Sequence, residues 1–320
     1  MATSVVALSG GVGGAKLALG LSHVVAPEEL LIVANTGDDF DHLGLRICPD
    51  LDTVMYTLAD RNNKELGWGQ VDETWHCMDA LSSLGGEAWF RLGDRDLATH
   101  LLRTRLLADG ASLSAVTQDL CNRFDIKHQL VPMTDDTVAT VVQTHAGEDL
   151  AFQHYFVRDR CEPEVSGFEF AGIESAKPAP ALMTAIAAGA TLIVCPSNPF
   201  VSVDPVLSLP GVVDAALAGG AGLVAVSPIV GGMAIKGPAA KMMHELGMPQ
   251  TALGVAEHYV SKYPHLFRGF VIDRTDEALA SSIEALGLPT LVTQTVMVTL
   301  QDRIDLARQV LAFAQEIATT

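Results

Sequence analysis

The chain has 320 residues, and 20 Lys and Arg against 38 Asp and Glu give a formal net charge of −18 at pH 7 with histidine neutral. Hydrophobic residues make up 49% of the chain and charged residues 18%, so the apolar surface is ample for a folded core and excludes a disordered protein. The negative charge argues against a nucleic-acid partner, because the electrostatic attraction that drives backbone binding has the wrong sign. A phosphorylated small molecule remains compatible if backbone amides, a few basic groups or a bridging cation bind it.

Cysteine usage and hydropathy bear on the cellular compartment. The five cysteines are widely spaced and form no C-x-x-C pair, which indicates reduced thiols in the cytoplasm. No basic segment precedes the first apolar run, so this run predicts a strand and not a signal peptide. Prolines or glycines interrupt the uncharged stretches 178–203 and 215–235, so neither predicts a membrane span. We therefore expect a cytoplasmic protein without a membrane partner.

The first forty residues carry the clearest structural signal. Residues 4–8 are a short apolar run, residues 9–14 are a glycine-rich loop, and residues 15–25 have helical periodicity. Residues 30–34 predict a second buried strand, and a polar loop at residues 35–39 ends it. Strand, glycine loop, helix and strand form the opening βαβ unit of a parallel, doubly wound sheet.

The remaining pattern predicts a helical middle region followed by further alternation of strands and helices. Later strands are predicted at residues 129–132, 137–144, 150–156, 191–195, 223–227, 269–272 and 288–293. Later helices are predicted at residues 53–59, 96–107, 112–124, 239–246, 276–286 and 301–317. We predict an α/β fold with a modified Rossmann-like, doubly wound, mostly parallel sheet and an inserted mainly helical region. Residues 1–320 would form one domain, with a core of about 1–60 and 130–320 and an insertion of about 61–128.

The glycine-rich loop is a candidate phosphate site. Without a Cβ atom in the way, backbone amides and the helix N-terminus can approach a phosphate. The spacing is not that of a dinucleotide fingerprint, whose third glycine would fall on Lys16, nor of a P-loop, because Leu17 follows Lys16. A tight structural turn is the alternative. The position after a strand favours phosphate or nucleotide binding, since α/β folds bind ligands there.

Four carboxylates follow at the same predicted end of the sheet, namely Asp38, Asp39, Asp50 and Asp52. Carboxylates beside a phosphate-accepting loop repel the ligand unless a cation lies between them. Mg²⁺ is bound in this way, by one or two carboxylates together with substrate phosphates. For Asp50 and Asp52, capping of the helix predicted at residues 53–59 is an equally good interpretation.

Three further loops carry polar residues near predicted strand or helix ends. Residues 91–100 include Arg91 and His100 around a helix start, where internal pairing at a solvated helix end is the alternative interpretation. Ser197 and Asn198, flanked by prolines, follow the strand at 191–195, and residues 227–232 repeat this arrangement after the next strand. Two such loops after adjacent strands favour a ligand cleft over turn formation alone.

Taken together, these segments resemble the 2-phospho-L-lactate transferases, the CofD/FbiA-type enzymes of coenzyme F420 biosynthesis. The resemblance runs nearly end to end and rests on an ordered set of motifs. These motifs are residues 9–16 (SGGVGGAK), 35–39 (NTGDD), 48–53 (CPDLDT), 67–69 (GWG), 92–96 (LGDRD), 196–199 (PSNP) and 227–229 (SPI). The glycine loop alone is a weak signal, whereas the ordered set is specific.

The resemblance implies a Mg²⁺-dependent transferase and its substrates. The enzyme would move a phospho-hydroxyacid moiety from its guanosine diphosphate ester to the ribityl hydroxyl of Fo, the 8-hydroxy-5-deazariboflavin precursor. The products would be GMP and F420-0 or a close variant. The moiety could be of the 2-phospho-L-lactate, phosphoenolpyruvate or phosphoglycerate type, and the sequence does not choose among them. The family's fold is a modified Rossmann core with a helical insertion, usually in a homodimer.

The resemblance also implies site residues in this sequence. Asp38 and Asp50 are our hypothesised Mg²⁺ ligands and, with Asp52, the expected catalytic residues. Asp52 and Arg91 are expected to contact Fo. The residues expected around the guanine nucleotide and its phosphates are Gly10, Gly11, Gly13, Gly14, Lys16, Ser197 and Asn198.

Two other functions are compatible with parts of the pattern. A UDP-sugar-binding regulator of the gluconeogenesis-factor type would have a similar glycine loop and fold without catalysis, but the motifs at residues 49–53 and 92–96 argue against it. An NAD(P)-dependent oxidoreductase is disfavoured by the broken G-x-G-x-x-G spacing.

Overall fold

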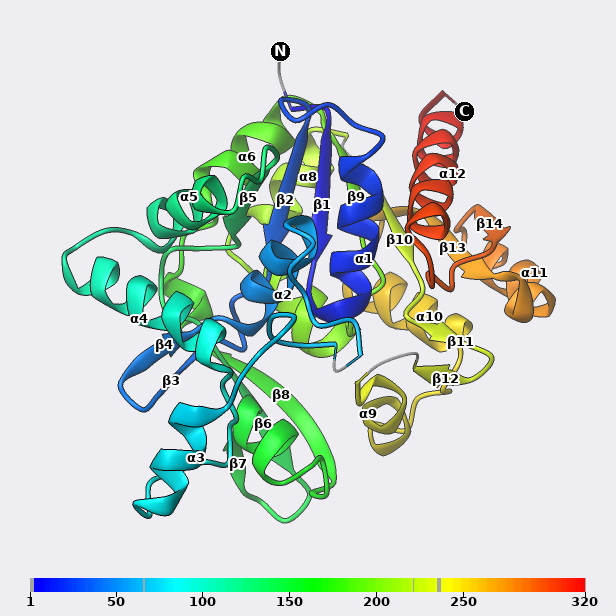
Figure 1. The fold of residues 1–320 in the computed structure, drawn as a ribbon. Helices are drawn as coiled ribbons and strands as arrows, with labels where there is room; N and C mark the ends of the chain where they lie inside the picture. The colour runs from blue at the N-terminus through cyan, green and yellow to red at the C-terminus, as the bar shows by residue number, and fades with distance from the viewer. Residues whose placement is uncertain (1–2, 66, 221, 235–236, 320) are drawn as a thin grey trace.

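A computed structural model describes residues 3–65, 67–220, 222–234 and 237–319 and has a parallel sheet at its centre (Figure 1). Its strands are β1 (Val5–Ser9), β2 (Leu30–Ala34), β5 (Gln129–Pro132), β9 (Thr191–Val194), β10 (Leu223–Val226), β13 (Phe267–Asp273) and β14 (Thr290–Thr293). The order in the sheet is β14-β13-β10-β9-β1-β2-β5, and every neighbouring pair is parallel. The predicted α/β class and mostly parallel sheet are therefore confirmed.

The strand order places a switch point between β1 and β9. The chain runs outward from β1 to β2 and β5, and then returns to β9 on the other side of β1 before it continues to β14. The loop that leaves β1 therefore leads to a helix on one face of the sheet, and the loop that leaves β9 leads to residues 199–207 on the other face. Doubly wound folds bind their ligands in the crevice at such a point.

Both faces of the sheet are buried, which explains the uninterrupted apolar strands. In β1, Val6 and Leu8 face one hydrophobic core, whereas Val5 and Ala7 face the other. Every residue of β1 and β2 is buried. Successive side chains of a strand point to opposite faces, so a sheet covered on both sides needs continuous apolar runs and not alternation.

The helices divide between these two cores. One face is covered by α1 (Gly11–Ser22), α2 (Pro49–Leu58), α5 (Leu113–Arg123) and α12 (Leu300–Thr319). The other is covered by α6 (Pro180–Ala187), α8 (Val212–Ala218), α9 (Ala239–Glu245), α10 (Ala252–Lys262) and α11 (Ala280–Glu284). Within the described residues, no single helix has the length and apolar composition of a membrane span, although one pair, Pro199–Leu207 with Val212–Ala218, bent by 69°, meets those criteria jointly.

Smaller elements lie beyond the carboxyl ends of the central strands (Figure 1). They include α3 (His76–Ser83), α4 (Asp94–Ala108), a hairpin of β3 (Phe40–His42) and β4 (Leu45–Ile47), and a hairpin of β11 (Ile229–Val230) and β12 (Met233–Ala234). The short helix α7 (Asp204–Leu207) directly follows a π-helix at Pro199–Val203. The strands β6 (Ala139–Thr144), β7 (Asp149–Ala151) and β8 (Val165–Ala171) form a separate antiparallel sheet. The proposed division into core and insertion at residues 61–128 stays a prediction.

The strand predicted at residues 150–156 is wrong from residue 152 onward. β7 ends at Ala151, and a π-helix, η1 (His154–Arg158), follows. Phe152 and Tyr155 are both buried, and the ring of Phe152 stacks on that of Phe156 at 5.5 Å between centroids. Aromatic side chains three and four residues apart meet on one side of a helical turn, whereas a strand would separate them.

Two other elements also differ from expectation, one in its start and one because it is absent from the predicted strands. α1 begins at Gly11, four residues before the predicted start at residue 15, because glycines in a first turn carry no side chains that could reveal the helical period. β8 was not predicted. It pairs with β6 alone in its sheet, and its residues from Ser166 onward are only partly buried or exposed, so its apolar pattern is weak.

Close packing of α1 on α12 gives a test of this fold. A Cβ atom on Gly20 would lie 2.1 Å from the carbonyl oxygen of Arg303. Helix propensity alone would make Gly20→Ala stabilising by about 1 kcal/mol. We expect the backbone clash to outweigh this gain, so that Gly20→Ala lowers the free energy of unfolding by about 1–3 kcal/mol in urea titrations. Leu84→Ala, at a side chain 85% exposed, should change it by less than about 0.5 kcal/mol. Equal or greater stability of Gly20→Ala would contradict the packing.

Candidate functional site

The glycine loop and the loop after β9 form one structural unit at the switch point. A Cβ atom on Gly13 would lie 2.3 Å from the carbonyl oxygen of Pro196, and one on Gly14 would lie 2.7 Å from the hydroxyl of Ser197. The Ser197 hydroxyl also donates to the carbonyl oxygen of Gly10 at 2.9 Å and accepts from the amide of Gly10 at 3.1 Å. Glycine is thus required at these positions because the loop after β9 lies so close to them. This close contact brings the motifs at residues 9–16 and 196–199 together.

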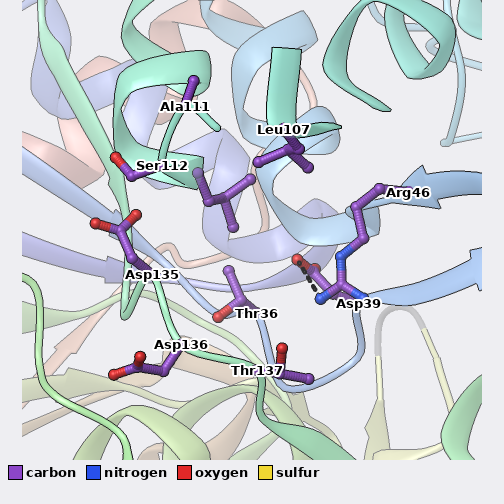
Figure 2. Close-up of a pocket in the computed structure, with 10 residues that line it drawn as sticks. Thr36, Asp39, Arg46, Leu107, Ala111, Ser112, Asp135, Asp136 and Thr137 are labelled. Carbon is purple, nitrogen blue, oxygen red and sulfur yellow. Dashed lines mark ion pairs between the residues drawn. The ribbon is translucent and has the colours of Figure 1, made fainter. Parts of the chain in front are cut away.

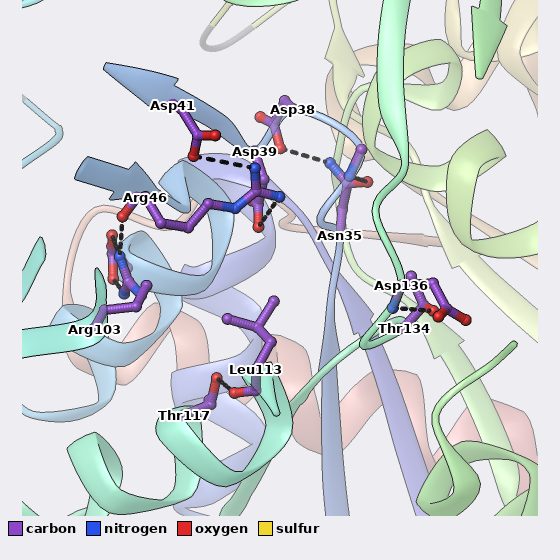
Figure 3. A network of polar contacts seen from close by, with 12 residues as sticks. Asn35, Asp38, Asp39, Asp41, Arg46, Arg103, Leu113, Thr117, Thr134 and Asp136 are labelled. Atoms are coloured by element: carbon purple, nitrogen blue, oxygen red, sulfur yellow. Dashed lines mark hydrogen bonds and ion pairs between the residues drawn. The ribbon is translucent and has the colours of Figure 1, made fainter. Parts of the chain in front are cut away.

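Asp38 and Asp50 meet at the side-chain amide of Asn35. The Asn35 nitrogen Nδ2 lies 3.0 Å from Asp38 Oδ1 and 3.0 Å from Asp50 Oδ2 (Figure 3 shows the contact with Asp38). Its oxygen accepts from the amide of Gly37 at 2.9 Å, which fixes the orientation of the amide. Asp50 Oδ1 accepts from the amide of Gly11 at 2.6 Å. The structure therefore brings both hypothesised metal ligands to the N-terminus of α1.

The carboxylates of this cluster are buried and have raised pKa values. Burial raises the pKa of Asp50 to about 6, although hydrogen bonds from Asn35 and Gly11 oppose the shift. Burial and the nearby charges of Asp50 and Asp39 raise the pKa of Asp38 well above its usual value. Burial also raises the pKa of Asp39 to about 7, against the attraction of Arg46. The cluster thus resists full ionisation unless a cation is added.

Asp52 lies in the same turn of α2 but faces a different partner. Both of its oxygens accept from the guanidinium of Arg103, with Nη1 at 3.0 Å from Oδ2 and Nη2 bonded to Oδ1. Arg103 Nη1 also lies 3.1 Å from His100 Nδ1, and His100 Nε2 is 3.3 Å from Asp96. The hydroxyl of Tyr56 donates to Asp96 at 2.6 Å. These residues form a buried network of ion pairs and hydrogen bonds between α2 and α4.

This network contains a possible metal-binding group. Asp52, Asp96 and His100 each offer a ligand atom within 4.8 Å of the others, and it is the one group of three such residues found in the described part of the chain. Arg103 already bonds both oxygens of Asp52, and its positive charge would repel a metal ion there. The donor set therefore fits an ion-pair network better than a metal site.

A cavity of about 170 Å³ opens beside Asp39 at the carboxyl ends of β2 and β5 (Figure 2). It is lined by Thr36, Asp39, Arg46, Leu107, Ala111, Ser112, Leu113, Asp135, Asp136 and Thr137. Neither oxygen of Asp39 has a hydrogen-bond partner among the described residues, and Arg46 Nη2 is 3.8 Å away. A second hollow of about 370 Å³ shares Arg46, Leu107 and Thr137 with the first. A polar ligand could enter here next to the carboxylates.

Three other expected site residues have structural contacts instead. The guanidinium of Arg91 lies 4.7 Å from the ring of Trp75 and 3.4 Å from Asp79. The ammonium of Lys16 donates to the carbonyl oxygen of Met297 at 3.1 Å. Asn198 accepts from the amide of Phe200 at 3.0 Å and so caps the π-helix η3 (Pro199–Val203). Their expected ligand contacts stay predictions.

Sequence reasoning missed two residues that organise the site. Asn35 belongs to a polar loop in the sequence, and an amide directly after a buried strand is well placed to orient neighbouring carboxylates. Arg103 lies in the middle of a predicted helix. Asp96, His100 and Arg103 are spaced i, i+4 and i+7, which places them on one face of a helix and could have revealed the buried network.

Comparisons with known proteins identify the family of the chain. The model of a family described as 2-phospho-L-lactate transferase CofD matches residues 5–291. A protein of Streptomyces avermitilis named phosphoenolpyruvate transferase is 42% identical over 319 residues, which cover 98% of this chain and 99% of that protein. A protein of the same name from Thermobifida fusca is 40% identical over 298 residues, or 89% of this chain and 91% of that protein.

A solved structure supports the fold. A member of the UPF0052 family from Bacillus halodurans has a TM-score of 0.67 and covers 97% of this chain and 99% of its own, at 13% sequence identity. Identity this low shows likeness of fold alone. The family assignment rests on the match over residues 5–291 and on relatives about 40% identical along nearly the whole chain. This chain belongs to the 2-phospho-L-lactate transferase (CofD) family.

Proposed function

We propose that the protein transfers a phospho-hydroxyacid moiety from a guanosine diphosphate ester to the ribityl hydroxyl of Fo, giving GMP and F420-0 or a close variant. We further propose that the transfer needs Mg²⁺ and takes place in a cytoplasmic homodimer. Relatives 40–42% identical bear the name phosphoenolpyruvate transferase, which favours the enolpyruvyl ester as the donor. Family membership supports the class of transferase, and the arguments below concern the site.

The observation that carries the proposal is the pair of carboxylates joined by the Asn35 amide beside the glycine loop. Asp38 and Asp50 lie 3.0 Å from the same nitrogen at the N-terminus of α1, where a phosphate would be stabilised. Two unmatched carboxylates there would repel a diphosphate. A divalent cation between the carboxylates and the phosphates removes this repulsion, and Mg²⁺ prefers such mixed oxygen ligands.

The balance of buried charge points the same way. Asp38, Asp39, Asp50 and Asp52 are all buried, and the buried or partly buried cations beside them are the guanidiniums of Arg46 and Arg103. If all four carboxylates ionise, two negative charges remain without a match, and one divalent cation would neutralise them. Burial is the main cause of the raised pKa values of Asp38, Asp39 and Asp50, and at Asp38 the nearby charges of Asp50 and Asp39 raise the pKa further.

The roles of the chain's own residues follow from this arrangement. Asp38 and Asp50 would hold Mg²⁺, which would offset charge on the diphosphate as the acceptor oxygen bonds to the acid-bearing phosphorus and GMP departs. The amides of Gly10 and Gly11 already donate to Ser197 and Asp50, so the phosphates would meet the next amides of the first turn of α1. Alignment of the two substrates is the main task, since phosphoryl transfer requires little covalent chemistry from the protein.

The acceptor would approach from the cavity beside Asp39. Hydroxyl and carboxyl groups of Thr36, Thr137 and Asp136 line it and suit a polyol chain. Asp52 lies in the same α2 turn as Asp50, and Arg103 holds its carboxylate. Asp52 could therefore orient the acceptor only while it stays bonded to Arg103. If Arg91 contacts the ring of Fo, its guanidinium must either move away from the ring of Trp75 or bind Fo while it stays over Trp75.

The first test is direct. Purified protein should be incubated with Fo, MgCl₂ and, separately, the lactyl, enolpyruvyl and glyceryl diphosphoguanosine esters, with product masses and GMP release measured. We expect the enolpyruvyl ester to give the fastest turnover, and chelation of the metal to stop it. Titration with UDP-sugars and nicotinamide nucleotides tests the regulator and oxidoreductase alternatives. No product with any donor would refute the transferase.

Removal of one proposed metal ligand gives a sharper prediction. Asp50→Asn keeps the side-chain volume and removes the charge, so we expect turnover to fall by about 100-fold or more at saturating substrates, with weaker dependence on Mg²⁺. Asp60→Asn is the matched control, because Asp60 follows the C-terminal end of the same helix and its side chain is 81% exposed. Unchanged turnover and Mg²⁺ dependence in Asp50→Asn would show that the metal assignment is wrong.

The raised pKa of buried Asp39 predicts the pH dependence of stability without metal. A carboxyl group with a raised pKa stabilises the folded state fully below its unfolded pKa, and this contribution is lost as pH rises through its folded pKa. The folded-state pKa of Asp39 is about 7, so its contribution to stability is lost as the pH rises through about 7. We expect the free energy of unfolding to rise as pH falls from about 7 to 5, and Asp39→Asn to reduce this slope by up to about 1.4 kcal/mol per pH unit. The control Asp125→Asn, at a side chain 92% exposed, should leave the slope unchanged. An unchanged slope in Asp39→Asn would contradict the raised pKa.

A further inference from the structure

Arg103 is a buried arginine that connects the helix bearing the proposed metal ligand to the helical region after it. It lies on α4, is 2% exposed, and bonds both oxygens of Asp52 on α2. Its Nη1 also lies 3.4 Å from the carbonyl oxygen of Arg46 on β4 (Figure 3). One guanidinium thus contacts three separate segments of the chain: α2, α4 and the β3–β4 hairpin.

We propose that Arg103 is a positioning residue for the transfer reaction, which fixes the first turn of α2 and thereby the carboxylate of Asp50. This inference rests on the proposed function, in which Asp50 holds Mg²⁺. It assigns to α4 a part in the geometry of the site and not only in covering the sheet.

The first turn of α2 is held from two sides. Asp50 accepts from the amide of Gly11 at 2.6 Å and from Asn35 at 3.0 Å, which ties the turn to the switch point. Asp52, two residues later, is bonded to Arg103 through both oxygens. A bidentate contact defines both the position and the orientation of a carboxylate. Rotation of the turn about the helix axis would therefore break one set of bonds or the other.

Other residues orient Arg103 itself. His100 Nδ1 lies 3.1 Å from Arg103 Nη1, while its other ring nitrogen is 3.3 Å from Asp96, which also accepts from Tyr56 at 2.6 Å. The contacts to Asp52, His100 and the Arg46 carbonyl oxygen all lie on the Nη atoms, so the end of the guanidinium is held in place and has little freedom to follow a displaced α2.

Stability alone does not explain this arrangement. Burying an ion pair removes two charges from water, and well-packed apolar residues often give equal or greater stability. The fork of a guanidinium, in contrast, matches a carboxylate in a geometry that lysine does not reproduce. A role in geometry predicts that Arg103→Lys, which keeps the charge, changes the site more than it changes the fold.

The experiment compares Arg103→Lys and Arg103→Met with the wild type. The control is Arg105→Met, two residues further along α4, where the side chain is 80% exposed. Each variant is tested for urea unfolding, for Mg²⁺ binding by calorimetry, and for kcat and KM with Fo. We expect Arg103→Lys to raise the Mg²⁺ concentration for half-maximal turnover, and the calorimetric Kd, about tenfold, with a lower kcat and a nearly unchanged urea midpoint. Arg105→Met should match the wild type.

The outcomes separate this inference from the proposed function. If the wild type forms product and Arg103→Lys has wild-type Mg²⁺ dependence and kcat, the inference is overturned and the function stands. If the wild type binds Mg²⁺ but forms no product with any donor, the function fails, and the calorimetric Kd of Arg103→Lys still decides the inference. If the wild type does not bind Mg²⁺, both fail. Should Arg103→Met not fold, the Arg103→Lys results alone decide.

Discussion

The shared hydrogen bond donor of Asn35 is the contact on which the site depends. Its amide nitrogen lies 3.0 Å from both Asp38 and Asp50, and 3.1 Å from the carbonyl oxygen of Val201 in η3. Three segments distant in sequence, after β2, at the start of α2 and after β9, therefore meet at one side chain. Buried carboxylates are costly unless hydrogen-bonded or paired, so this donor is what allows two of them to lie beside the switch point.

The same contact explains why the surrounding glycines cannot carry side chains. A Cβ atom on Gly10 would lie 2.7 Å from Asp50 Oδ2 and 2.4 Å from the Cβ of Ser202. The N-terminus of α1, the Asp50 carboxylate and the π-helix η3 are thus packed so closely at Gly10 that no side chain fits there. A ligand phosphate at this N-terminus would be within reach of both the helix amides and a cation held by the carboxylates.

The sequence predicted the central sheet well because parallel strands covered on both faces have continuous apolar runs, as at Leu30–Ala34. It failed at residues 152–156, where spacing compatible with a strand belongs to a π-helix whose aromatic side chains turn toward the core. The position of Asp38 could be anticipated from the parallel sheet, because it follows β2, whereas Asp50 lies at the start of α2, after the β3–β4 hairpin. The direction in which Asp52 points could not be anticipated, because it depends on Arg103, 51 residues later, on a helix whose docking is a tertiary event.

Fold and chemistry separate clearly in this molecule. The Bacillus halodurans structure has the same fold at 13% identity. Likeness of fold alone does not specify a reaction, because one fold can carry different sites. What distinguishes a site is the set of charges placed at that switch point: Asp38 and Asp50 on the Asn35 amide, Asp39 facing a cavity, and Asp52 clamped by Arg103. Under the proposed function, four carboxylates against two guanidiniums would make an anionic substrate dependent on added positive charge. The acidity of the whole chain thus has a local counterpart, in which surplus negative charge is concentrated where a diphosphate would bind.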